Sequence, residues 1–320
     1  MIRLYRELKK RGVLGLNARN ARYIMPRNPR RYYPLVDNKI LCKRRLVEHA
    51  VAVPELLGEV GSQYEAGHLA NKLADLDEFV IKPASGSGGD GILVATGRYE
   101  DKVWHGSGGR LLALSDIEYH VSGILTGMYS LGGQIDTAMI ESLVHTDQRF
   151  RQLAPEGVPD IRVILYRGIP VMAMTRLPTR RSSGKANLHQ GAIGAGIDLV
   201  TGLTLRAVMS SRQVDLHPDT RHSVVDFQIP DWETLLTIAT RCFEAIPLGY
   251  MGIDLVIDQD HGPLVLEMNA RPGLAIQIAN DDGLGCRLAA VDRLDNPESR
   301  SAQERLKIGL ELARDDWGRK

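Results

Sequence analysis

A pair of apolar runs in the last third of the chain constrains its fold more than any other feature. Residues 252–258 and 263–269 are continuous or alternating in Ile, Leu and Val, which is typical of strands. The four residues between them, Gln-Asp-His-Gly, favour a turn. The sequence therefore predicts two strands paired as an antiparallel hairpin.

Polar residues interrupt these strands in a pattern that predicts a metal site. Glu267 and Asn269 are two positions apart, so a strand places both side chains on one face, and antiparallel pairing can bring Asp254 to the same place. Mg²⁺ prefers such hard oxygen ligands and typically leaves its other positions to phosphates and water. A surface hairpin with incidental acids is the alternative, but a Glu inside an otherwise apolar run argues against it.

A glycine-rich loop, residues 84–91, joins two further predicted strands, residues 79–83 and 92–95. The loop reads Ala-Ser-Gly-Ser-Gly-Gly-Asp-Gly and matches G-x-G-x-x-G. In a dinucleotide-binding fold the last glycine leads into a helix, whereas here it leads into a strand, which excludes that interpretation. The sequence also lacks the protein-kinase and P-loop motifs. We therefore predict a lid whose backbone N–H groups close over phosphates, with Lys82 as a point charge; a mobile surface hairpin is the alternative.

Composition and charge exclude several classes of protein. The 320 residues are 43% hydrophobic with a net charge of +1, so the chain can bury a core and has no global attraction to nucleic acid or to a membrane. Three scattered cysteines show no metal or redox spacing, which fits a reducing cytoplasm. The sequence shows no secretory signal, no apolar run long enough to span a membrane and no nucleophilic triad. We therefore predict a cytoplasmic protein.

The first 31 residues differ from the rest in charge. They contain ten Lys or Arg and one acid, Glu7. Such a block can steer a protein to an anionic surface or substrate, although a basic helix is more often a solvated face. Apolar residues interleave with the charges, so we expect one side of this segment to pack (Leu4, Leu8, Val13, Leu14 and Leu16).

The remaining pattern predicts helices and hairpins without a βαβ rhythm, which favours an α+β fold. We predict an extended stretch at 28–34, a helix capped by Asp37 and running to Ala50, and a hairpin around Arg167-Gly168. Residues 178–220, rich in Gly, Ser and Arg, read as a looser region. Other predicted helices cover residues 2–11, 115–131, 231–245 and 296–315, with a strand at 138–144.

Four signatures occur in a fixed order, and together they resemble the ATP-grasp superfamily. They are Asp37-Asn-Lys39, the strand at 79–83 with its glycine loop, Asp160-Ile-Arg162, and Asp254 with Glu267-Met-Asn-Ala-Arg-Pro-Gly. The likeness runs from about residue 37 to residue 280. It is greatest to the ligases related to ribosomal protein S6 glutamate ligase, in the subgroup of α-L-glutamate ligase-like proteins.

The resemblance implies an ATP-grasp fold in which two α+β subdomains clamp ATP. Only 36 residues precede Asp37, where such ligases usually carry a whole N-terminal α/β domain, so we expect a shortened basic segment in its place. The domains expected are a basic helical segment (1–36), a helical lead-in (37–78), a lid subdomain with the glycine loop (79–145), a central subdomain with the metal site (146–290) and a C-terminal helix (291–320).

The resemblance also implies a role for each matching residue. The metal ligands would be Asp254, Glu267 and Asn269. The residues expected at the reacting groups are Arg162, Arg176, Lys185, Asn187 and Arg271. Those expected to contact the nucleotide are Lys39, Lys82, Ser85, Gly86, Ser87, Gly88, Gly89, Gly91, Glu141, Ser142, Leu143 and Val144.

The implied activity is ATP- and Mg²⁺-dependent joining of a carboxylate to an amine through an acyl phosphate, with Mn²⁺ as an alternative metal. The substrate would be an amino acid such as glutamate or an acidic peptide. Two other functions stay open: a kinase-like phosphotransferase, and a nucleotide-binding regulatory protein without turnover. For assembly, a homo-oligomer and a partner protein bound to the basic N-terminal segment both stay open.

Overall fold

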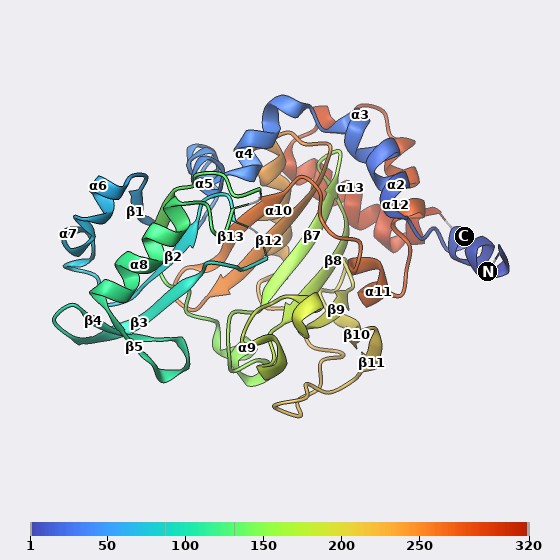
Figure 1. Cartoon of the computed structure of the whole chain (residues 1–320). Helices are drawn as coiled ribbons and strands as arrows, with labels where there is room; N and C mark the ends of the chain where they lie inside the picture. The colour runs from blue at the N-terminus through green and yellow to red at the C-terminus, as the bar shows by residue number, and fades with distance from the viewer. Residues whose placement is uncertain (1, 87, 131, 319–320) are drawn as a thin grey trace. The chain divides into compact units, whose positions relative to one another are not determined.

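The chain divides into two compact units in the computed structural model, which describes residues 2–86, 88–130 and 132–318. The larger unit comprises Met1–Asp37, Leu41–Val53 and His145–Lys320. The smaller unit comprises Asn38–Ile40 and Pro54–Val144. Each unit has its own sheet and hydrophobic core, and each is described by itself below (Figure 1).

The smaller unit is an antiparallel sheet in the order β1-β6-β2-β3-β4-β5, with helices packed against it. Its core includes the edge-to-face pair Phe79 and Trp104, whose ring centroids are 5.5 Å apart. The strands are β1 (Leu56–Val60), β2 (Phe79–Pro83), β3 (Leu93–Glu100), β4 (Val103–Gly106), β5 (Leu111–Ala113) and β6 (Ala138–Glu141). The helices are α6 (Gln63–Ala66), α7 (Leu69–Leu73), α8 (Leu114–Leu125) and the 3₁₀ turn η3 (Ser107–Gly109).

The larger unit is built on an antiparallel sheet in the order β11-β10-β9-β8-β7-β12-β13. Every residue of β12 is buried, which explains why its sequence is an almost continuous apolar run rather than an alternating one. The strands are β7 (Asp160–Tyr166), β8 (Ile169–Leu177), β9 (Ile193–Ile197), β10 (Thr204–Met209), β11 (Arg212–Val214), β12 (Tyr250–Asp258) and β13 (Gly262–Asn269).

Helices α10 and α13 pack against each other and against strands of this sheet (Figure 1). The helices of the larger unit are α1 (Ile2–Lys10), α2 (Leu16–Arg19), α3 (Met25–Arg27), α4 (Tyr33–Asp37), α9 (Gln148–Leu153), α10 (Trp232–Ala245), α11 (Ile276–Asn280), α12 (Leu284–Asp292) and α13 (Ala302–Arg314), and most of α5 (Lys39–Glu48). Single turns are η1 (Asn20–Ile24), η2 (Arg30–Tyr32), η4 (Arg180–Ser182), η5 (Leu188–Gln190), η6 (Pro297–Ser299) and η7 (Asp316–Gly318). Among the described helices, none is long and apolar enough to cross a membrane.

Both predicted hairpins of the larger unit are confirmed. Strands β12 and β13 pair antiparallel, and so do β7 and β8. Arg167 (φ 51°) and Gly168 (φ 77°) form the turn between β7 and β8 in the left-handed conformation that tight hairpins need. The predicted α+β class is therefore confirmed.

The expectations for residues 28–37 are wrong in part. Only Asn28 and Pro29 are extended, and the chain is helical from Arg30 onward. Pro34 falls in the first turn of α4, where its missing N–H costs nothing. Asp37 ends α4, and the next helix begins after Asn38, whose side chain accepts a hydrogen bond from the Ile40 N–H (3.0 Å).

The expectation of a loose region at 178–220 is also wrong, because this segment contains β9, β10 and β11. Strand β9, Ile-Gly-Ala-Gly-Ile, has little strand propensity but is entirely buried. A Cβ on Gly196 would lie 2.7 Å from the Ala279 carbonyl oxygen of α11. The glycines therefore allow a helix to approach the strand closely, a requirement that the local sequence does not reveal.

Two helices are shorter than the predicted ranges 115–131 and 296–315, and the basic segment packs less than expected. Helix α8 stops at Leu125 and is followed by Gly127 at φ 84°, and α13 begins only after Ser301, which caps it together with Glu304. In the basic segment Leu14 is buried as expected. Leu8, Val13 and Leu16 are exposed, which contradicts the expected packing, and the side chain of Leu4 lies outside the described residues.

Candidate functional site

A row of charged residues crosses four neighbouring strands of the larger unit. Asp254 on β12 is paired with Glu267 on β13 on one side and with Arg162 on β7 on the other. Further along β7, Asp160 is paired with Arg176 on β8. Residues two apart on a strand share a face, so Asp160 and Arg162 point to the same side of the sheet. Ordinary strand geometry thus brings the charges together.

The arginines of this row hold its aspartates by paired hydrogen bonds. The Nε and Nη2 atoms of Arg162 donate to the two carboxylate oxygens of Asp254 at 2.6 and 2.5 Å. Arg176 donates in the same way to Asp160 (2.6 and 2.5 Å) and also lies 3.0 Å from Asp254 Oδ2. Asp254 and Asp160 are buried, and both arginines are nearly so. Such forked, buried contacts fix the carboxylates in one orientation.

The three predicted metal ligands lie together beside these arginines. Asn269 Nδ2 donates to Glu267 Oε1 (3.0 Å) and to Asp254 Oδ2 (3.3 Å). Two carboxylates and an amide are the hard oxygen donors that Mg²⁺ takes, so this set fits the ion. With Asp160, three acids face two arginines, which leaves one negative charge in excess for a cation. The set contains only two acids and completes its donors with an amide; in the described part of the chain, no group of three or more His, Cys, Asp or Glu side chains is placed to hold a metal ion.

The buried charges shift one another's ionisation in opposite directions. Burial opposes ionisation of Asp254, but Arg162 and Arg176 outweigh it and hold the pKa of Asp254 well below its usual range. Burial raises the pKa of Asp160 to about 6, and the negative charge of Asp254 adds to this effect, against the opposing charge of Arg176. Asp254 is therefore the permanent anion of the cluster.

The glycine loop of the smaller unit connects β2 to β3, as predicted, and is fixed at its start. The carboxylate of buried Asp136 accepts hydrogen bonds from the Ser85 N–H (3.1 and 2.9 Å). Lys39 Nζ donates to the Gly86 carbonyl oxygen. Farther along, Gly88, Gly89 and Gly91 have φ values of 69°, 79° and 75°, which only glycine adopts without strain. Ser87 lies outside the described residues.

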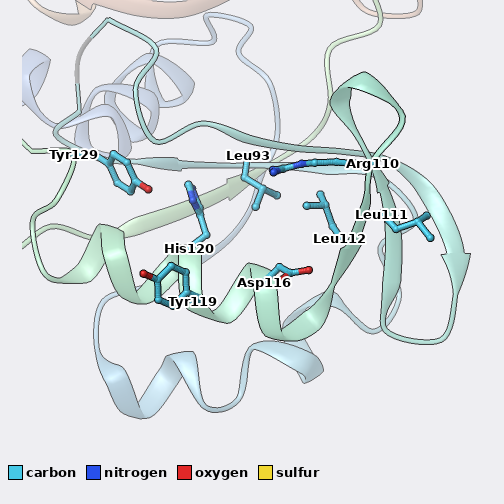
Figure 2. Close-up of a pocket in the computed structure, with 8 residues that line it drawn as sticks. All are labelled: Leu93, Arg110, Leu111, Leu112, Asp116, Tyr119, His120 and Tyr129. Carbon is cyan, nitrogen blue, oxygen red and sulfur yellow. The ribbon is translucent and has the colours of Figure 1, made fainter.

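The end of the loop is held by two aromatic side chains, which border a cavity of about 380 Å³ (Figure 2). His120 on α8 bonds the Gly91 carbonyl oxygen through Nε2 (2.8 Å), so Nε2 carries the hydrogen. The ring of Tyr129 fills the space that a Cβ on Gly91 would need, at 2.5 Å. Burial lowers the pKa of His120, which favours the neutral ring that makes this bond.

Lys82 forms a buried ion pair with Glu141 on the neighbouring strand β6. The next residue, Ser142, is tied to Glu55 by two hydrogen bonds of 2.9 Å: Ser142 N–H donates to the Glu55 carbonyl oxygen, and Ser142 Oγ accepts from the Glu55 N–H. The N–H of Ser142 is therefore already used within the unit. Leu143 and Val144 follow, and Val144 is the last residue of the smaller unit.

The other expected site residues lie on connecting segments of the larger unit. Lys185 and Asn187 lie between β8 and β9, and Asn187 caps η5 by accepting from the His189 N–H (3.0 Å). Arg271 follows β13 and is exposed, with its guanidinium 4.6 Å from the centre of the Tyr33 ring.

The sequence patterns missed the residues that support the site. Asp160 was noted only as part of a signature, although its spacing of two from Arg162 places both on one face. Asp136, His120 and Tyr129 carry no local pattern, because each reaches the glycine loop from a distant part of the chain. Such contacts depend on tertiary structure alone.

The α+β fold with two antiparallel sheets is that of an ATP-grasp protein. The chain belongs to the family of sugar-transfer associated ATP-grasp proteins, whose family model matches residues 18–293. The predicted membership of the ATP-grasp superfamily is thereby confirmed. No curated protein matches the sequence significantly.

Solved structures with a similar fold include three ATP-grasp or related enzymes. The ATP-grasp ligase PsnB, complexed with a phosphomimetic variant of its minimal precursor, Mg and ADP, is 15% identical, with a TM-score of 0.43, over 83% of this chain and 60% of its own. Biotin carboxylase from Campylobacter jejuni is 16% identical, with a TM-score of 0.49, over 85% of this chain and 49% of its own. An ATP-grasp RimK domain protein from Sphaerobacter thermophilus is 11% identical, with a TM-score of 0.44, over 81% of this chain and 68% of its own. The chain thus spans less than two thirds of the length of the first two.

Proposed function

We propose that this protein is an ATP- and Mg²⁺-dependent ligase that joins a carboxylate to an amine through an acyl phosphate. Membership of an ATP-grasp family supports ATP-dependent ligation in general. The observation that carries the proposal is the convergence of Asp254, Glu267 and Asn269 beside two arginines on one face of the sheet. Phosphoryl transfer needs mostly cations and positioning, and such a cluster supplies both.

In this proposal, Asp254, Glu267 and Asn269 would hold Mg²⁺, or Mn²⁺, which when bound neutralises phosphate charge. Arg162 and Arg176 are already fixed by Asp254 and Asp160, so their remaining N–H groups would be held in place to donate to transferred phosphate oxygens once the metal is bound. The exposed Arg271 would bind the substrate carboxylate or the acyl phosphate, and the segment with Lys185 and Asn187 would contact the reacting phosphate.

The smaller unit would bind the nucleotide. Lys39 and Lys82 would supply charge to its phosphates, and the backbone N–H groups of the glycine loop would line them. The left-handed glycines expose backbone without side chains, as a close approach to phosphate requires. Residues 141–144 would contact the adenine, and because the Ser142 N–H is already bonded, this contact would use other groups of the segment.

The substrate we propose is an amino acid such as glutamate, or an acidic peptide. The test is ADP release from ATP and Mg²⁺ across a panel of amino acids and carboxylates, with mass spectrometry of the products. ADP that depends on both an acid and an amine, with a product of their summed mass minus water, would support the ligase. ATP binding without turnover across the panel would favour a regulatory protein instead.

A second candidate is transfer of phosphate to a hydroxyl group. The description of the family as sugar-transfer associated favours this candidate, because sugars offer hydroxyls as acceptors. The panel should therefore contain neutral sugars, amino sugars and uronic acids. A product heavier by one phosphate, formed without an amine, would replace the ligase proposal by a kinase.

A further inference from the structure

The second half of the first helix lies at the surface of the larger unit. In α1 every side chain from Arg6 to Lys10 is exposed, and so is that of Arg11. A nine-residue helix is marginal in water by itself, and most helical stability in proteins comes from packing. We therefore asked which surface could cover this helix.

The helix leaves the larger unit from a fixed point. Leu14 is buried, and its backbone N–H and carbonyl both bond the side chain of Gln277 at 2.8 and 3.0 Å. The Gly12 carbonyl oxygen accepts from the Gly285 N–H at 2.8 Å. The chain is thus anchored directly after α1, which lies at the edge of the unit beside the N-terminus in Figure 1.

The exposed surface combines positive charge with apolar side chains. The segment carries only one acid, Glu7, and four exposed basic side chains (Arg6, Lys9, Lys10 and Arg11). Leu8, Val13 and Leu16 expose 41%, 38% and 60% of their surface. Cations and leucines exposed within one short segment are typical of helices that lie in the interface of a bilayer.

We propose that α1 and the residues that follow it, up to Leu16 at the start of α2, bind the surface of an anionic phospholipid bilayer. Basic residues next to such a surface are attracted by its negative potential, and exposed leucine and valine gain by entering the boundary between headgroups and acyl chains. The phosphates of a nucleic acid could pair with the same basic side chains, but a nucleic acid has no apolar surface that would bury the exposed leucine and valine side chains. The combination therefore favours a bilayer over a nucleic acid.

The test is flotation of the full-length protein with vesicles of phosphatidylcholine alone, or of phosphatidylcholine and phosphatidylglycerol in equal parts. The wild type should bind only the anionic vesicles. Replacing Arg6, Lys9, Lys10 and Arg11 by Gln should weaken binding by roughly 600-fold, since each basic residue contributes roughly fivefold at such a surface. A control that removes four exposed charges elsewhere, Lys72, Lys102, Arg212 and Lys307, should bind like the wild type.

A second variant separates a bilayer from any other polyanion. Replacing Leu8, Val13 and Leu16 by Gln keeps every charge and, because all three are exposed, should leave the fold intact. It should weaken vesicle binding about tenfold and leave binding to duplex DNA unchanged. The proposal is overturned if the wild type ignores anionic vesicles, if the charge control loses binding equally, or if this apolar variant binds vesicles like the wild type. None of these outcomes depends on ATP turnover, so they are independent of the proposed function.

Discussion

At the scale of single residues, Glu267 provides the clearest test of the metal site. Replacing Glu267 by Gln removes one negative charge but keeps an oxygen that can accept from Asn269 Nδ2. We expect Mn²⁺ binding, followed by electron paramagnetic resonance, to weaken, and turnover to fall by on the order of a hundredfold or more. The free energy of unfolding should change by no more than about 1 kcal/mol, because the side chain is only partly buried.

The matched control for Glu267 is Glu59, an acid of the smaller unit on strand β1. Its replacement by Gln changes the net charge equally and should leave Mn²⁺ binding as in the wild type. Equal Mn²⁺ affinity in the wild type and the Glu267 variant would remove Glu267 from the metal site. Equal turnover at saturating Mg²⁺ would point the same way.

The buried Asp160 should make stability depend on pH. Its folded pKa, about 6, lies above the unfolded value of roughly 3.9. Between these two values the folded state holds a proton that the unfolded state has released, so the free energy of unfolding falls as pH rises. The ionised Asp254 also stabilises the folded state, because its folded pKa lies below the unfolded value. That stabilisation is lost only as the pH falls below the unfolded pKa of roughly 3.9, so it does not affect the slope between pH 4 and 6. Denaturant unfolding of Asp160→Asn should therefore lack the decline between pH 4 and 6 that the wild type shows. A decline of equal slope in both proteins would show that Asp160 is ionised throughout this range.

At the scale of elements, the end of the glycine loop is a tightly constrained segment of the smaller unit. Gly91 has a φ of 75°, and a Cβ there would lie 2.5 Å from Tyr129 Cγ. Gly91→Ala should therefore destabilise this unit by about 2–4 kcal/mol, from left-handed backbone strain and overpacking together. Gly97→Ala is the matched control, because Gly97 lies on the adjoining strand β3 with open space around its Cβ position. Urea unfolding followed by Trp104 fluorescence, with Trp232 and Trp317 replaced by Phe, would measure both, and equal midpoints would contradict the constraint.

The elements that the sequence predicted well are those with a strong local signal. Strand β2 has its predicted bounds, and the hairpins carry both apolar strands and turn residues. Strand β9 was missed because its glycines serve the close approach of α11, which is a long-range requirement. The basic segment was misjudged for a related reason: apolar residues at helical spacing predict a packing face but not what covers it.

At the candidate site, too, local patterns were predicted and long-range contacts were not. The spacing of Glu267 and Asn269 was enough to predict that they share a face with Asp254 on the paired strand, and the structure places them together. The pairing of Arg162 with Asp254 joins residues 92 positions apart, so it required knowledge of which strands are neighbours. The sequence thus indicated the donors, whereas strand order determined their partners.

At the scale of the whole molecule, the two units have separate cores that can be monitored separately. Trp104 belongs to the core of the smaller unit, whereas Trp232 and Trp317 belong to that of the larger one. Replacing Trp232 and Trp317 by Phe therefore leaves Trp104 as a reporter of the smaller unit. A ligand that binds only the folded state stabilises it by about 2.7 kcal/mol when present at about 100 times its dissociation constant.

We expect ATP to raise the urea midpoint of the Trp104 signal in this reporter protein, because the proposed nucleotide contacts lie in the smaller unit. Testing the role of Lys82 by alanine alone would be ambiguous, since it would leave Glu141 buried without its lysine partner. The double variant Lys82→Met/Glu141→Gln removes both charges while keeping similar volumes, and it should lose most of the ATP-induced shift. The control variant, Lys72→Met, lacks an exposed lysine of the same unit and should retain the shift. If the double variant responds to ATP as strongly as its parent, then Lys82 serves the core of the smaller unit and does not bind the nucleotide.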